Sequence, residues 1–305
     1  MTSGHSMARA GRGAKAGLDL ATFQIVCVPI IGLAYALHLR GLAPGSRVRE
    51  LGVIAFLFAC AWAAEETSVL RYQLYAYPDA WWGKLDEVPV LVAAIWPMVI
   101  LSARSVVRAL FPRARGLRLA WMVGLAVVWD ASLVEIVAVD GGLWGWREGG
   151  YFGVPPIGIL GWGCFAASAT LALEWALEGE RPRVPQRAWL AKLAAPWVAL
   201  GGTHALMVGL WWLAFRWIGR SAWPELSVVG FVVVSAALVI ALVRRRERVP
   251  LLIAAPRMCA AAAFVAQLAA RGDRAPLLLW VHVGAVAAPY LATLAWPWSR
   301  APIIR

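Results

Sequence analysis

The chain has 305 residues, of which 61% are hydrophobic and 15% charged, and its mean hydropathy is +0.68. Soluble domains average about 45–50% apolar and about 25% charged residues, so this composition excludes a water-facing globular protein. The formal net charge of +12 raises the question of nucleic acid. Most arginines, however, lie in short segments between apolar runs, a pattern that is typical of membrane proteins and argues against a nucleic-acid partner.

Nine apolar runs approach or exceed the length of about 20 residues that crosses a bilayer core. In chain order we predict spans at 20–39, 51–70, 88–103, 117–138, 157–177, 189–215, 226–243, 250–269 and 276–295. The sequence therefore predicts an all-α fold, a polytopic transmembrane helical bundle of about seven to nine spans. Residues 18–305 are expected to form this single domain, and the basic, Gly-rich residues 1–17 to form a disordered tail.

The connections between the runs alternate in charge. The Arg-rich segments are predicted to be cytoplasmic by the positive-inside rule; they are 40–50, 104–118, 178–192 and 244–249. The mixed or acidic segments fall on the opposite face; they are 71–87, 139–156, 216–225 and 271–275. This alternation predicts an integral membrane protein with its C-terminus inside and its N-terminus outside, which we expect in a bacterial cytoplasmic membrane.

Four carboxyl groups lie at similar depths in or at the edge of two predicted spans, namely Glu65, Glu66, Asp130 and Glu135. An ionised carboxyl at membrane depth costs at least about 2.5–3.5 kcal/mol, so it pairs, faces the bundle interior or stays neutral. A neutral buried acid can deliver a proton. We predict Asp130 and either Glu65 or Glu66 as proton-handling acids. Glu135 is a third candidate, because about 140° of helix separates it from Asp130. A helix-packing hydrogen bond or a solvated helix end are the alternatives.

Aromatic residues surround these acids. We predict that a pocket is shaped by Tyr72, Tyr75, Trp144, Trp146, Tyr151 and Phe152, with an interfacial aromatic belt as the alternative. Ring faces stabilise a nearby cation by about 0.5–2 kcal/mol, so acids beside aromatic faces suit protonation of an alkene to a carbocation. His204 and His282 lie in separate runs, and no cluster has metal-ligand spacing. The sequence therefore predicts no metal and no cofactor.

The same two segments resemble the membrane proteins of carotenoid biosynthesis that include the carotenoid 1,2-hydratases (bisanhydrobacterioruberin hydratase-like). The first segment carries Glu65–Glu66, YQLYAY at 72–77, Val88–Pro89 and WPM at 96–98. The second carries Trp129–Asp130, Leu133, WGW at 144–146, GGYFGVP at 149–155 and GW at 161–162. Two positions differ from the family pattern: its L-D-P reads Leu133–Val134–Glu135 here, and an Asn shortly before G-W reads Gly158.

The resemblance implies a hydratase, that is, a hydro-lyase that works without a cofactor. An acid would protonate a terminal alkene of a lipophilic isoprenoid or carotenoid, and water would capture the cation. One alternative is a terpene or lycopene-type cyclase, which starts with the same protonation and excludes water. The other is a non-catalytic carotenoid-binding scaffold or a transporter. Weak internal symmetry would favour a transporter, and the sequence shows none.

Overall fold

In the computed structural model, residues 19–177, 185–215, 223–244, 249–272 and 275–294 are described, and the predicted tail at 1–17 lies outside them. These residues form α1 (Leu20–Arg40), α2 (Pro44–Glu66), α3 (Val90–Leu110), α4 (Gly116–Asp140), α5 (Pro156–Leu177), α6 (Pro185–Leu210), α7 (Pro224–Arg244), α8 (Leu251–Ala269) and α9 (Leu277–Leu294). Short π-helices follow α2 at Thr67–Arg71 and α6 at Trp211–Phe215. Seven helices, α1 to α7, are long and apolar enough to cross a membrane. The prediction of an all-α polytopic membrane bundle is confirmed.

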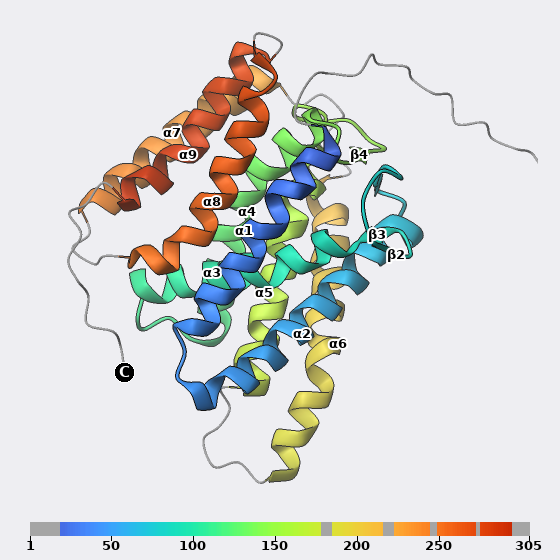
Figure 1. Ribbon diagram of the computed structural model, residues 1–305, viewed down its shortest axis with the longest axis vertical. Helices are drawn as coiled ribbons and strands as arrows, with labels where there is room; N and C mark the ends of the chain where they lie inside the picture. The colour runs from blue at the N-terminus through green and yellow to red at the C-terminus, as the bar shows by residue number, and fades with distance from the viewer. Residues whose placement is uncertain (1–18, 178–184, 216–222, 245–248, 273–274, 295–305) are drawn as a thin grey trace, which may run out of the picture.

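The helices form a layered bundle in which α4 and α5 occupy the middle (Figure 1). α6 packs against the outer side of α5, while α7 and α9 pair with each other at the opposite side. α8 lies between these groups and contacts α1, α3 and α4. Residues from the last third of the chain therefore reach the helices that carry the predicted acids.

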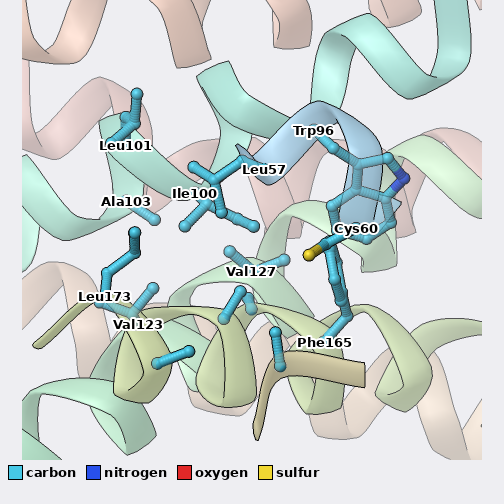
Figure 2. Packing of buried hydrophobic residues seen from close by; sticks show 14 of the residues in the cluster. Leu57, Cys60, Trp96, Ile100, Leu101, Ala103, Val123, Val127, Phe165 and Leu173 are labelled. Carbon is cyan, nitrogen blue, oxygen red and sulfur yellow. The ribbon is translucent and has the colours of Figure 1, made fainter. Parts of the chain in front are cut away.

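The central core is made of apolar side chains from α2, α3, α4 and α5. Leu57, Ile100, Val123 and Val127 are completely buried and interlock with Phe165 (Figure 2). In a bilayer such packing stabilises the bundle chiefly through van der Waals contact, because lipid tails are as apolar as these side chains. The core fixes α2 and α4, the helices that carry the predicted acids, relative to each other.

Glycine allows α4 and α5 to approach each other closely. A Cβ atom placed on Gly124 of α4 would lie 2.9 Å from the carbonyl oxygen of Gly163 in α5 and 3.0 Å from the Cβ of Ala167. One neighbour is a backbone atom and the other is a Cβ atom, so neither can move by a change of side-chain rotamer. Small residues at such crossings are typical of membrane helices.

Gly124→Ala should therefore destabilise the protein by about 1–3 kcal/mol, the usual cost of overpacking a well-filled core. Unfolding of the detergent-solubilised protein, followed by circular dichroism, measures the change. Gly52→Ala in α2 is the matched control, because nothing lies within 4 Å of its added Cβ. Equal stability of the two variants would contradict the tight crossing.

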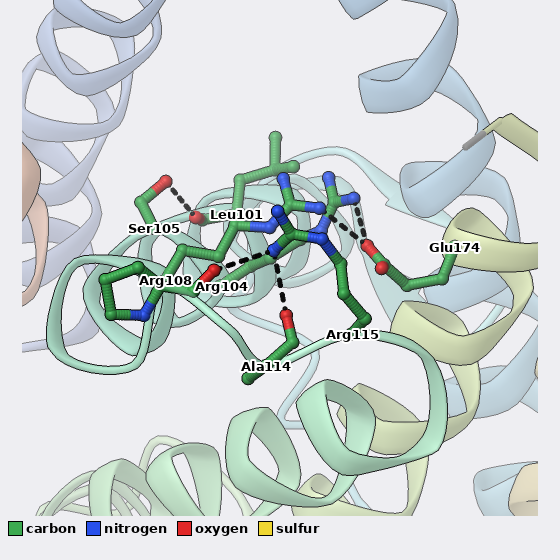
Figure 3. A network of polar contacts seen from close by, with 8 residues as sticks. Leu101, Arg104, Ser105, Arg108, Ala114, Arg115 and Glu174 are labelled. Carbon is green, nitrogen blue, oxygen red and sulfur yellow. Dashed lines mark hydrogen bonds and ion pairs between the residues drawn. The ribbon is translucent and has the colours of Figure 1, made fainter. Parts of the chain in front are cut away.

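The third predicted span ends too early at residue 103, because Arg104 and Arg108 were placed in a cytoplasmic loop. α3 continues to Leu110, and both arginines pair with Glu174 near the end of α5, Arg108 at 2.8 Å (Figure 3). Nearby, Arg115 donates to the carbonyl oxygens of Pro112 and Ala114. Because Glu174 pairs with both guanidinium groups, the helix can carry them past the predicted end.

At the other end of α3 and α5, short strands connect the helices. β1 (Tyr75–Ala76) pairs antiparallel with β4 (Gly145–Trp146), and β2 (Lys84–Leu85) pairs with β3 (Val88–Pro89). The β1–β4 pair joins the segment that follows α2 to the segment that follows α4. This pairing brings the two stretches of sequence that contain the predicted acids and aromatics to one face of the bundle.

Candidate active site

Glu65 lies near the end of α2 with its carboxyl group held by three aromatic side chains. The hydroxyls of Tyr75 and Tyr77 donate to its Oε2 atom, Tyr77 at 2.9 Å. The indole N–H of Trp96 in α3 donates to its Oε1 atom at 2.8 Å. Burial and the neighbouring Glu65 carboxyl raise the pKa of both tyrosine hydroxyls well above the usual value. Both tyrosines therefore keep their protons.

Glu135 lies in α4 and is held by a second set of three aromatic side chains. The indole N–H groups of Trp144 and Trp146 donate to its Oε2 atom at 2.9 and 3.0 Å. Trp162 in α5 donates to its Oε1 atom at 2.7 Å. Each glutamate thus has one oxygen with two donors and one oxygen with a single donor.

The two sets of rings touch each other in pairs. Tyr75 lies against Trp146 with ring centroids 4.7 Å apart, and Tyr77 lies near Trp144 at 6.1 Å. The third pair, Trp96 and Trp162, is 4.6 Å apart. A donor of one glutamate therefore contacts a donor of the other in every case.

The strand register relates these pairs by a local two-fold axis. Tyr75 is opposite Trp146, and Ala76 is opposite Gly145, so the axis passes between the two small residues. The donors follow Glu65 by 10, 12 and 31 residues, and they follow Glu135 by 9, 11 and 27. The sequence hid this repeat because tyrosine in one half is tryptophan in the other and the spacings differ.

Glu65 and Glu135 line one cavity of about 170 Å³ between the helices. A single water needs only about 10–15 Å³ on the same measure, so the space admits more than a few waters. Apolar side chains form most of the wall, among them Ile30, Ile31, Met98, Ile157 and Phe264. The cavity therefore combines a predominantly apolar surface with two buried carboxyl groups.

Asp130 lines the same cavity but has different partners. Its Oδ1 atom pairs with the guanidinium of Arg257 in α8 at 2.6 Å and accepts from the hydroxyl of Tyr290 in α9. Helix geometry alone had argued against Asp130 and Glu135 serving one ligand. Both nevertheless line one cavity, because it is large enough to pass along the side of α4.

The remaining predicted residues lie at other places. Glu66 is buried and absent from the cavity wall, and its carboxyl group lies beside Asp86 and Glu87. Tyr72 is partly exposed and approaches His204 at 3.3 Å. Tyr151 and Phe152 pack around His282 instead of the cavity. Of the six predicted pocket aromatics, Tyr75, Trp144 and Trp146 line it. No group of three potential metal ligands occurs within the described ranges.

The site residues predicted from the sequence lack five residues that contact these carboxyl groups. Tyr77, Trp96 and Trp162 donate to the glutamates, and all three lie in blocks already marked by the resemblance. Counting back nine to twelve residues from the aromatic residues of each aromatic-x-aromatic motif to a glutamate would have found the common arrangement. No comparable motif marks Arg257 and Tyr290, the partners of Asp130 in the last third of the chain.

Gly158, which departs from the family pattern, has a structural role beside Glu135. A Cβ atom at this position would lie 2.7 Å from Cζ2 of Trp146 and 2.8 Å from a methyl carbon of Val154. The indole ring of Trp146 thus occupies the space that a side chain at residue 158 would need. The absence of a side chain here allows Trp146 to reach Glu135.

Gly158→Ala should displace Trp146 and weaken its hydrogen bond to Glu135. A hydrogen bond to a charged group contributes about 1.5–3 kcal/mol, so we expect a loss of activity of about tenfold with little loss of folded protein. The measurement is the amount of hydrated isoprenoid formed by membranes that contain equal amounts of each variant. Gly209→Ala in α6, where the added Cβ meets nothing within 4 Å, is the control; equal activities of the two variants would refute this role.

Comparison with known proteins gives one match. A family model described as "Carotenoid biosynthesis protein" matches residues 23–221, which is more than half of the chain and includes both glutamates with all six aromatic donors. No curated protein and no solved structure matches the chain.

Proposed function

Because the chain belongs to the carotenoid biosynthesis protein family, and so has a role in carotenoid metabolism, we propose that it is a membrane hydratase of a carotenoid or related isoprenoid. The proposed reaction adds water to a terminal alkene without a cofactor. The observation that carries this proposal is the pair of buried glutamates, Glu65 and Glu135, that face one largely apolar cavity. A bacterial cytoplasmic membrane is the proposed location.

Paired carboxyl groups can divide the work of acid and base. Two carboxyls that share a site favour a state in which only one of them is ionised. Hydration needs both forms at once, because the alkene must receive a proton and the attacking water must lose one. A neutral and an ionised glutamate across one cavity meet both requirements.

The hydrogen-bond partners indicate which glutamate has which role. Glu135 is surrounded by three indole N–H groups, and indole can only donate. A proton on Glu135 would find no acceptor among these partners, so they favour its ionised form. Two of the partners of Glu65 are tyrosine hydroxyls, which can both donate and accept. Neutral Glu65 can therefore donate to a tyrosine oxygen, or to substrate, without leaving a partner unsatisfied.

The reaction then proceeds in balanced steps. The proton of Glu65 moves to the less substituted alkene carbon, the π bond breaks, and a tertiary cation forms at the other carbon. A water oxygen forms the new C–O bond, and the ionised Glu135 takes a proton from the resulting oxonium. Return of that proton to Glu65 through cavity water restores the resting state. The net change is alkene plus water to tertiary alcohol.

The aromatic rings would stabilise the cation between these steps. Trp96 and Trp162 lie together between the glutamates, and both line the cavity. A ring face contributes about 0.5–2 kcal/mol to a desolvated cation. The apolar wall formed by α1, α3 and α8 suits the hydrocarbon chain that follows the reacting end.

Product analysis in labelled water tests the proposal. Cells that make acyclic carotenoids, with and without this chain, would be grown in water enriched in ¹⁸O, and their pigments analysed by mass spectrometry. We expect a new tertiary alcohol that carries the label. A product with unchanged mass would indicate a cyclase. Bound but unchanged pigment would indicate the scaffold or transporter. The local two-fold relation between the Glu65 and Glu135 halves is compatible with a transporter, because some transporters are built from parallel repeats.

A further inference from the structure

The cavity contains a second polar site, formed where α4, α8 and α9 meet. Arg257, Asp130 and Tyr290 lie at this site, and all three line the cavity. The guanidinium carbon of Arg257 is 5.7 Å from the ring centroid of Tyr290. The proposed hydration assigns no step to any of these residues, although two charges at membrane depth are costly to maintain.

Arg257 has one nitrogen in use and one without a partner. Its Nη2 atom donates to Asp130 at 2.6 Å and to the carbonyl oxygen of Ala126 at 3.2 Å. Its Nη1 atom is buried and has no hydrogen-bond partner within the described residues. The side chain is only 9% exposed. Buried donors are almost always satisfied, and Arg257 is a residue of the cavity wall, so its unpaired Nη1 atom indicates a ligand bound beside it.

The charge of the site limits the chemistry of that ligand. Asp130 already neutralises Arg257, so a phosphate or carboxylate would add an uncompensated negative charge in a setting that disfavours it. A neutral oxygen can accept from Nη1 without changing the net charge. A hydroxyl or carbonyl oxygen is therefore the group that fits.

The position of the site relates this oxygen to the reacting alkene. Asp130 and Glu135 are five residues apart on α4, which corresponds to about 7.5 Å along the helix axis. The small side chains of Ala260 and Ala261, about one helical turn after Arg257 in α8, also line the cavity. One molecule can thus reach both polar sites with a short hydrocarbon segment between them.

We propose that Arg257, held by Asp130 and Tyr290, binds a hydroxyl or carbonyl oxygen of the isoprenoid whose terminal alkene faces Glu65 and Glu135. The substrate would then carry an oxygen a few carbon–carbon bonds from the reacting double bond. This inference rests on the proposed function in taking an isoprenoid as the ligand and in placing its terminal alkene beside Glu65 and Glu135.

Two small probes that differ in a single oxygen test the inference. Geraniol has a terminal isopropylidene group and a hydroxyl a few bonds away, and its deoxy hydrocarbon has methyl in place of the hydroxymethyl group. Calorimetric titration of the purified protein in detergent gives the ratio of the two affinities. Partitioning into micelles is the same for every variant, so differences between variants in this ratio report the site.

We expect the ratio of the affinity for geraniol to the affinity for the hydrocarbon to be about tenfold higher in the wild-type protein than in the Arg257 variants. This is the factor for one charge-assisted hydrogen bond. Arg257→Lys should lose this preference because it keeps the positive charge beside Asp130 and lacks the second nitrogen. Arg257→Met combined with Asp130→Asn should lose it as well, without leaving an unpaired charge if Arg257→Lys does not fold.

An equal ratio in the wild-type protein and both variants would overturn the inference; it is also the result expected if the nitrogen binds only water. Glu135→Gln separates this outcome from a failure of the proposed hydration. That variant should keep the preference for geraniol, because Glu135 does not contact Arg257, even though it loses turnover. Loss of the preference in Glu135→Gln would also count against a separate oxygen site.

Discussion

Glu65→Gln should reduce formation of the tertiary alcohol by about 10²–10⁴-fold, the usual contribution of a positioned acid. Glutamine has nearly the same shape: its carbonyl oxygen can accept from Trp96 while its NH2 group donates to the hydroxyl oxygens of Tyr75 and Tyr77. Its amide, however, cannot supply the proton. The alkene should also stop exchanging hydrogen with solvent. Mass spectrometry of product and recovered substrate after incubation in D₂O measures both effects.

Glu148→Gln is the matched control for this prediction, because Glu148 is an exposed carboxyl in the loop before α5. It should leave hydration unchanged. If Glu65→Gln retained wild-type hydration at an equal amount of folded protein, Glu65 would not be the acid.

Glu135→Gln should reduce hydration by a similar factor of about 10²–10⁴, but with a different isotopic result. Glu65 can still protonate the alkene, and the cation can return its proton, so recovered substrate should gain deuterium in D₂O. Water capture should fail because no base accepts the proton of the oxonium. The same mass spectrometry thus distinguishes the two glutamates.

The reverse pattern, with exchange in Glu65→Gln and none in Glu135→Gln, would mean that the roles are exchanged. It would contradict the argument from donor-only indole partners while leaving hydration itself intact. Loss of exchange in both variants would show that neither glutamate acts alone in protonation.

The sequence predicted the helices well because each is a long apolar run between polar segments. It predicted the end of α3 poorly, since the charges of Arg104 and Arg108 resemble a loop when Glu174 is not known to be their partner. Hydropathy measures each residue alone. A charge compensated by a residue on another helix can therefore appear to end a span too early.

The candidate site was only partly predictable for a related reason. The resemblance and the cost of buried charge marked all four acids, but helix periodicity does not show which acids from different helices face one cavity. Glu135 ranked last in sequence and has three hydrogen-bond donors in the structure, whereas Glu66 lies one residue from Glu65 and is outside the cavity wall. Arg257 reaches Asp130 from 127 residues away, and no local pattern encodes that contact.

The pairing of β1 with β4 has a consequence for how such a site can diversify. Two identical halves around the contact of Ala76 with Gly145 would hold two chemically equivalent carboxyls, with nothing to distinguish donor from acceptor. Exchange of phenol for indole in one half makes them unequal while both keep their positions. On the proposed roles, the half that carries the tyrosines holds the proton donor, and the half that carries the tryptophans holds the proton acceptor. Exchanging these side chains between the halves should therefore exchange the roles of the two glutamates.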